Sequence, residues 1–160
     1  MNKVVRAGMF GFLAFIVVVE FFALSVSAKA PGLERIRTDP NGTWYINAKT
    51  MVNPASDRIS FWSTVVPQKN SAYFDVLGMV LEKRGKSAQR LEYVQILQEV
   101  DCSIGTINTS NVLFYDKQDR IVYTVNSPAS AKLIAEFGQA ADSILASVCG
   151  SQQLAQLMGE

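Results

Sequence analysis

The apolar residues of this chain follow two different patterns. Residues 7–19 form an almost continuous apolar run, whereas most later segments alternate apolar with polar residues or space apolar residues at helical intervals. Basic residues precede the run, and Val26-Ser27-Ala28 follows it as the kind of small-residue site that signal peptidases cut. We therefore expect residues 1–28 to be a signal peptide that is removed before Lys29.

An uncleaved membrane anchor is the alternative for this segment. Residues 7–28 are long enough to cross the roughly 30 Å of bilayer hydrocarbon, although Glu20 disfavours a permanent span because a carboxylate in the bilayer costs free energy. If the segment is cleaved, we expect no membrane span to remain. In either case the rest of the chain is expected to be exported, to the periplasm or to the cell surface.

Alternation of apolar and polar residues predicts an antiparallel sheet. The segment around Trp44 is rich in aromatic and β-branched residues, and Ile59, Phe61 and Val65 alternate with polar neighbours. A second alternating segment begins at Leu91. Its apolar residues fall on one face of the expected strand, and we expect that face to be buried. The expected strands cover residues 43–47, 58–66, 91–102, 104–115 and 119–125, the last two as a hairpin around the turn at residues 116–119.

Helical spacing of apolar residues appears twice. Residues 71–84 begin at the potential N-cap Ser71 and end before Gly85. After Pro128 a single apolar stripe, with Gly138 as an expected kink or break, predicts a C-terminal helix. The stripe consists of Ile134, Phe137, Ala141, Ile144 and Val148.

These segments predict one α+β domain over residues 43–149, an antiparallel sheet of about five strands with a C-terminal helix packed on it. Residues 29–42, which contain two prolines, are expected to be an N-terminal tether. Residues 150–160 are expected to be a frayed C-terminal tail.

The only two cysteines, Cys102 and Cys149, are expected to form one structural disulfide. Each lies on the apolar side of its predicted element, one on a strand and one on the C-terminal helix. The bond would close a loop of about 48 residues, which stabilises a domain by about 4 kcal/mol in the chain-entropy description.

Composition excludes several kinds of chemistry. The chain contains no histidine, which rules out Ser-His-Asp triads, Cys-His dyads and histidine-ligated metals. Residues 29–160 carry equal numbers of basic and acidic residues, so we expect no broad positive field for anionic lipid and no nucleic-acid partner. Gly85-Lys86-Ser87 lacks the first glycine of a phosphate-binding loop. We expect no catalytic residue, no cofactor and no metal site, and hence no enzyme.

Three further groups of residues each allow two interpretations. A platform for a ligand is one interpretation of the aromatic residues, and burial in the core is the other. The basic cluster is either an anion-binding patch or a solvated helix end, and the aspartates of the 116–119 turn are either calcium ligands or turn formers. The aromatic residues are Trp44, Tyr45, Trp62 and Tyr115, and the basic cluster is Lys83, Arg84, Lys86 and Arg90.

Short motifs in several of these segments resemble the surface-adhesin protein E-like domain of Gram-negative bacteria. The matching stretches are WYIN at 44–47, FW at 61–62, YVQILQEVDC at 93–102, LFYD at 113–116 and SILASVC at 143–149. The resemblance implies a mainly antiparallel sheet with a C-terminal helix that the cysteine pair ties back. For the namesake of the family it also implies a surface lipoprotein that binds extracellular-matrix and serum proteins of a host, but this chain has no cysteine at the end of its signal segment to carry the lipid.

We therefore expect an exported, non-enzymatic envelope protein of a Gram-negative bacterium, an adhesin-like module that binds an extracellular-matrix or envelope protein. The alternative is a soluble periplasmic accessory or inhibitory protein with the same fold and no adhesive role. The sequence alone identifies neither the binding residues nor the oligomeric state.

Overall fold

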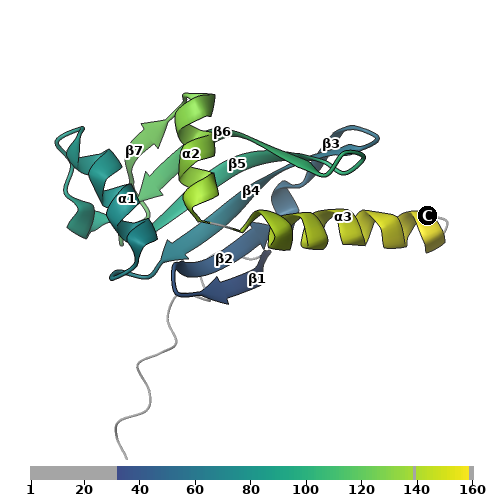
Figure 1. Ribbon diagram of the computed structural model, residues 1–160, viewed down its shortest axis with the longest axis horizontal. Coiled ribbons are helices and arrows are strands. Elements are labelled where there is room, and N and C mark those ends of the chain that lie inside the picture. Colours follow the sequence, from purple (N-terminus) through teal and green to yellow (C-terminus); the bar gives the residue numbers. More distant parts are fainter. Residues whose placement is uncertain (1–31, 139, 159–160) are drawn as a thin grey trace, which may run out of the picture. The chain divides into compact units, whose positions relative to one another are not determined.

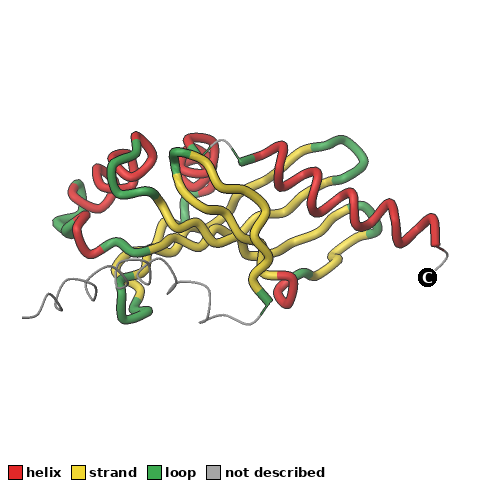
Figure 2. The backbone as a smooth tube through the Cα atoms, turned by 90° about the horizontal axis from the view of Figure 1, so that it is seen from below, coloured by secondary structure: helices red, strands yellow, loops and turns green. Residues whose placement is uncertain are grey.

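The alternating segments of the sequence form a single antiparallel sheet of seven strands, shown in Figures 1 and 2. The computed structural model describes residues 32–138 and 140–158, with the side chains up to Gly150, and the expected signal segment 1–28 lies outside the described residues. The strands are β1 (Leu33–Asp39), β2 (Gly42–Asn47), β3 (Val52–Ala55), β4 (Arg58–Pro67), β5 (Tyr93–Asp101), β6 (Thr106–Tyr115) and β7 (Ile121–Val125).

Three α-helices lie on one side of this sheet, as Figure 2 shows. They are α1 (Ala72–Glu82), α2 (Pro128–Phe137) and α3 (Ala141–Met158), and two single 3₁₀ turns, η1 (Ala48–Thr50) and η2 (Ala88–Arg90), complete the elements. The expected α+β fold is confirmed. Ser71 caps α1 as expected, because its hydroxyl accepts a hydrogen bond from the backbone N–H of Phe74 at 3.1 Å. No helix among the described residues is long and apolar enough to span a membrane.

The strands run in the order β1-β2-β4-β5-β6-β7 across the sheet, and β3 pairs with the start of β4. Strands β2 and β3 both pair with β4, and η1 separates them along the chain. At this interruption the hydroxyl of Thr50 accepts a hydrogen bond at 3.0 Å from the backbone N–H of Trp62, which keeps a ladder donor of β4 paired.

The core lies between the sheet and the helices. Alternate residues of β2, β4, β5 and β6 point to the helix side and are almost completely buried, as the alternation predicted. Helix α1 contributes residues one turn apart to the same core. The largest of these buried side chains are Trp44, Ile46, Phe61, Tyr73, Leu77, Leu81, Ile96 and Phe114.

Two strands were not expected, and both are at the margin of the sheet. Strand β1 falls inside the segment predicted to be a tether, because Glu34, Arg35 and Arg37 hide the apolar alternation. It forms by pairing with β2, and charged side chains are common on such edge strands. Strand β3 is fully exposed, and its Pro54 is a residue that indicates a turn more often than a strand. The expected count of about five strands was therefore too low.

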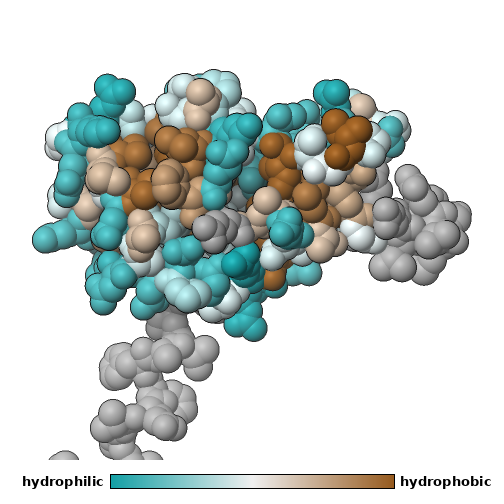
Figure 3. Space-filling model, in the orientation of Figure 1, coloured by the Kyte–Doolittle hydropathy of each residue, from teal (hydrophilic) through white to brown (hydrophobic). Residues whose placement is uncertain are grey.

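The C-terminal apolar stripe is broken in the structure. Helix α2 ends at Phe137 and α3 starts at Ala141, so the predicted break at Gly138 is confirmed. The two helices take different directions (Figure 1). Phe137 lies on the exposed face of α2 with Leu133 and is 48 % exposed, contrary to the single-stripe interpretation. In Figure 3, apolar side chains gather over α1 and α2 on this side of the molecule. Helix α3 continues to Met158, through most of the segment expected to be a frayed tail.

Gly138 is required by a close approach and not by its backbone angles. Its φ is −73°, which any residue adopts, but a Cβ atom at this position would lie 2.0 Å from Cζ2 of Trp44. The Trp44 ring is buried and stacks on Tyr73, with 5.9 Å between the ring centroids. The junction between α2 and α3 therefore fits directly against the end of a core side chain.

The disulfide joins Cys102 to Cys149, as expected, with 5.5 Å between the Cα atoms. Cys102 is the residue immediately after β5, and its backbone N–H donates a hydrogen bond to the carbonyl oxygen of Asp57 in the β3–β4 turn at 2.8 Å. Both cysteines are only half-buried. The bond thus ties the middle of α3 to the end of the sheet where β3, β4 and β5 meet.

We expect Cys102→Ala and Cys149→Ala each to lower the Tm of a chain that starts at Lys29 by about 10 °C or more. The loop that the bond closes restricts the unfolded chain by about 4 kcal/mol. Thermal denaturation followed by circular dichroism without reductant measures the change in Tm. Wild-type protein in reductant should have the same Tm as the variants. Variants that melt with oxidised wild type would show that the disulfide adds no stability.

We expect Gly138→Ala to destabilise the fold by about 2 kcal/mol, because the new methyl group has to displace a buried indole ring. Gly150→Ala is the matched control: it lies within α3, and its Cβ atom would meet nothing within 4 Å. Urea denaturation monitored by tryptophan fluorescence compares the two. Equal stability of both variants would contradict the close-approach explanation.

Candidate functional site

The four aromatic residues considered as a platform separate onto the two sides of the sheet. Trp44 points to the helix side and belongs to the core, whereas Tyr45 is next in the strand and points to the opposite side. Trp62 and Tyr115 lie between buried neighbours on β4 and β6 and share the side of Tyr45. The platform interpretation therefore fails for Trp44, and the other three residues lie on one face.

Tyr93 joins these three residues on the side of the sheet turned away from α1, α2 and α3. It was not among the predicted platform residues, although its parity opposite to Val94 already placed it on this side. We call this side the open sheet face. Its central residues are Tyr45, Trp62, Thr64, Tyr93, Gln95, Leu97, Asn111, Leu113 and Tyr115.

One end of the open sheet face is a stacked tyrosine pair. Tyr93 and Tyr115 are cross-strand neighbours whose rings lie 4.6 Å apart between centroids and are inclined by 10°. The Tyr93 hydroxyl donates a hydrogen bond to Asp119 Oδ1 at 3.3 Å. Burial, together with the charge of Asp119, raises the pKa of Tyr93 to about 12, and the same two causes raise the pKa of Tyr115. Both rings therefore stay neutral at physiological pH.

The centre of the face carries no charged side chain. One row of cross-strand neighbours runs from Tyr45 through Thr64, Gln95 and Leu113 to Thr124. A second row joins Trp62, Leu97 and Asn111. Large apolar groups and hydroxyl or amide groups thus both occur along these rows. Thr64 is buried, and the other side chains are half-buried.

The charges at the other end of the face are paired with one another. Arg58 lies 3.6 Å from Glu99 Oε1 and 3.6 Å from Asp101 Oδ2. The Ser103 hydroxyl donates a 2.6 Å hydrogen bond to Asp101 and is the main reason why the pKa of that carboxyl is lowered. The open sheet face therefore has an uncharged aromatic centre, with the paired charges around Arg58 at one end and the exposed Arg35, the cross-strand neighbour of Tyr45, at the β1 edge.

The turn between β6 and β7 is held by a buried carboxylate. Asp116 Oδ2 accepts hydrogen bonds from Arg90 and Arg120, each at 3.0 Å, and Oδ1 accepts from the backbone N–H groups of Gln118 and Arg120. The hydrogen bonds from Arg120 are the main cause that lowers the pKa of Asp116. Because two guanidinium groups already neutralise this carboxylate, the turn-former interpretation is confirmed over the calcium one.

The four residues of the basic cluster do not share one environment. Arg90 is occupied by Asp116, whereas Lys83, Arg84 and Lys86 are exposed at the end of α1. Within the part of the chain that the structure describes, none of these three side chains forms an ion pair.

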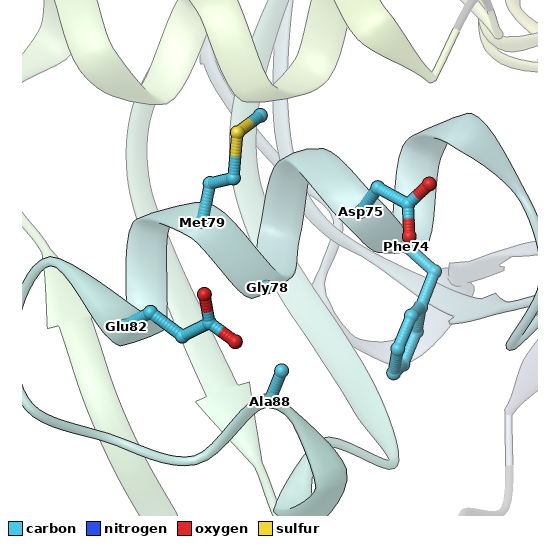
Figure 4. Close-up of a pocket in the computed structure, with 6 residues that line it drawn as sticks. All are labelled: Phe74, Asp75, Gly78, Met79, Glu82 and Ala88. Atoms are coloured by element: carbon cyan, nitrogen blue, oxygen red, sulfur yellow. The ribbon is translucent and has the colours of Figure 1, made fainter.

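Two hollows on the molecule bring together no set of groups typical of catalysis. One, of about 300 Å³, lies between α1 and η2 and is lined by Phe74, Asp75, Gly78, Met79, Glu82 and Ala88 (Figure 4). The other, of about 670 Å³, is lined by residues of β3, β4, β5, β6 and α2, with Lys132 as its cation. Over residues 32–138 and 140–158, no three histidine, cysteine, aspartate or glutamate side chains are grouped so as to hold a metal ion.

Comparison with known proteins gives distant structural neighbours only. No family model matches the sequence, and no curated protein sequence matches it. Two solved structures of Haemophilus influenzae protein E, one of them the selenomethionine form, are similar to this chain at 16 % sequence identity. The selenomethionine form aligns over 70 % of this chain and 92 % of its own with a TM-score of 0.37, and the other form over 70 % and 90 % with a TM-score of 0.36.

Proposed function

We propose that this chain is an exported, non-enzymatic protein-binding module of a Gram-negative cell envelope and that it binds its partner through the open sheet face. One observation carries the proposal: Tyr45, Trp62 and the Tyr93–Tyr115 pair gather around an uncharged centre, on a side of the sheet that no described helix covers.

The chemistry of the face suits a protein partner. Tyrosine and tryptophan provide much of the binding energy of protein interfaces, because they bury a large area at a small cost in conformational entropy. Interfaces also have a core depleted of charge and a polar rim, which is the distribution found here. The half-buried amide of Gln95 can hydrogen-bond to a partner without the cost of burying a charge.

Export is supported by the signal-like segment 1–28 and by the disulfide, since disulfides persist in oxidising compartments. The resemblance of the strand and cysteine motifs to the protein E-like domain supports an adhesin-like role, with an extracellular-matrix or envelope protein as partner. A periplasmic accessory protein would use the same face on a partner in its own compartment.

We expect Trp62→Ser to weaken binding at least about tenfold, because removal of an aromatic anchor from an interface costs about 2 kcal/mol or more. The assay is surface plasmon resonance of the chain from Lys29 against purified extracellular-matrix and serum proteins. Photo-crosslinking in living cells, with a benzophenone amino acid in place of Tyr45 or Trp62, covers envelope partners. Tyr45→Phe retains the ring and should bind like wild type.

Ile104→Ser is the matched control, because Ile104 is an apolar side chain, 70 % exposed, in the turn after β5. A crosslinker at position 104 should give no discrete adduct, whereas one at position 45 or 62 should. If Trp62→Ser binds every partner of the wild type with unchanged affinity and positions 45 and 62 give no adduct, the open sheet face is not the binding surface.

We expect protease added to intact cells to digest the domain, since an adhesin-like module acts at the cell surface. Cells with a permeabilised outer membrane are the control, and a periplasmic marker protein reports leakage. Protection in intact cells, with digestion only after permeabilisation, would place the domain in the periplasm and support the accessory role instead.

A further inference from the structure

The helix side of the molecule carries exposed apolar side chains that the core does not use. Met79 on α1 is 54 % exposed, and Leu133 and Phe137 on α2 are 55 % and 48 % exposed. Figure 3 shows apolar residues gathered over these two helices, bordered by hydrophilic ones. Single exposed apolar residues are ordinary, but a group of them on adjacent helices indicates contact with another molecule or with a membrane.

These side chains are exposed because each helix has a second apolar side. On α1, Met79 points away from the buried Tyr73, Leu77 and Leu81. On α2, Leu133 and Phe137 are one turn apart and share a face, while Ile134 enters the core. We call Met79, Leu133 and Phe137 the helical apolar patch.

A group of cations adjoins the helical apolar patch. Lys83 lies one turn after Met79 on the same face of α1, and Arg84 and Lys86 follow it. Residues 83–90 contain four basic residues and no acidic one, whereas residues 32–158 as a whole have equal numbers of both. With Arg90 held by Asp116, three exposed cations remain beside the patch.

The carboxylates near the patch do not cancel this charge. Glu82 lies one turn after Met79 and lines the same hollow next to η2 (Figure 4), so it offsets only one of the three cations. Asp75 is one turn before Met79 and lines the same hollow, but it is two turns before Lys83, and Glu136 pairs with Lys132 at 3.6 Å. The positive charge therefore gathers at the C-terminal end of α1.

We propose that this surface contacts an anionic lipid bilayer, with the helical apolar patch entering the boundary between headgroups and acyl chains and Lys83, Arg84 and Lys86 contacting lipid phosphates. Exposed apolar side chains beside lysine and arginine residues are the combination by which peripheral helices bind membranes. Long basic side chains also extend from an apolar surface toward headgroups. The open sheet face lies on the other side of the sheet (Figure 2), so a lipid-bound domain presents that face away from the membrane.

The test is flotation of the chain from Lys29, whose core and disulfide all lie within residues 32–158, with two kinds of vesicle. We expect binding to vesicles of phosphatidylethanolamine and phosphatidylglycerol, little binding to vesicles of phosphatidylcholine, and a decrease as salt is raised. The triple variant Lys83→Gln, Arg84→Gln, Lys86→Gln should lose binding about tenfold or more. The triple variant Met79→Ser, Leu133→Ser, Phe137→Ser should lose it to a similar extent.

Lys49→Gln and Ile104→Ser are the controls, since both residues are exposed away from α1 and α2, and both variants should bind vesicles like wild type. All variants are compared by Tm, and the charge triple serves as the decisive one if the serine triple does not fold.

No binding by the wild type, equal binding to neutral vesicles, or full binding by the charge triple would overturn the proposal. If Trp62→Ser floats with the vesicles like wild type, lipid binding does not depend on the open sheet face. If a crosslinker at Leu133 captures a protein while vesicles bind nothing, the patch is a protein contact instead.

Discussion

The structure depends on one constraint, the packing of all three helices against a single side of the sheet. Adjacent strand residues point to opposite sides, so the helices divide the residues of β2, β4, β5 and β6 into a set that faces the helices and a set on the open sheet face. Trp44 and Tyr45 show the effect most clearly: one ring stacks in the core against Tyr73, and the next lies on the open sheet face. The contact of Trp44 with Gly138 then fixes where the helical layer changes direction.

This arrangement gives the molecule two chemically different surfaces. The open sheet face is uncharged at its centre, and the neighbouring strands hold its aromatic side chains in place. The helical side has exposed apolar side chains beside exposed cations. Rigid aromatic surfaces favour a specific protein contact, whereas adaptable apolar and basic side chains favour a surface as variable as lipid. The sheet separates these two surfaces, so one can be occupied without blocking the other.

The sequence predicted the elements that bury an apolar face and missed those that do not. Strands β4 and β5 alternate clearly, and the N-cap Ser71 and the break at Gly138 are local signals. Strand β1 has mostly charged and half-exposed residues and exists because β2 offers it an edge. Phe137 shares the exposed face of α2 with Leu133, which a single apolar stripe drawn across α2 and α3 did not separate from the buried face of Ile134.

The platform shows a similar limit. Parity along the strand at residues 58–66 predicted that Trp62 lies opposite to Phe61, whereas the side on which Tyr115 lies was left open. Which side the helices would cover, and how β5 and β6 align so that Tyr93 meets Tyr115, follow only from the register of the sheet. Asp116 is a related case, because its two arginine partners come from different segments of the chain.

The number of cysteines has a consequence for how the protein matures. With Cys102 and Cys149 as the only thiols, one intramolecular pairing exists, and no wrong isomer can form within a single chain. The chain therefore requires an oxidant but no disulfide isomerase. Cys149 lies 47 residues after Cys102, so the bond cannot form until those residues have also been synthesised. Until then Cys102 is open to mixed disulfides with other thiols, and this interval is the time at which maturation is most vulnerable.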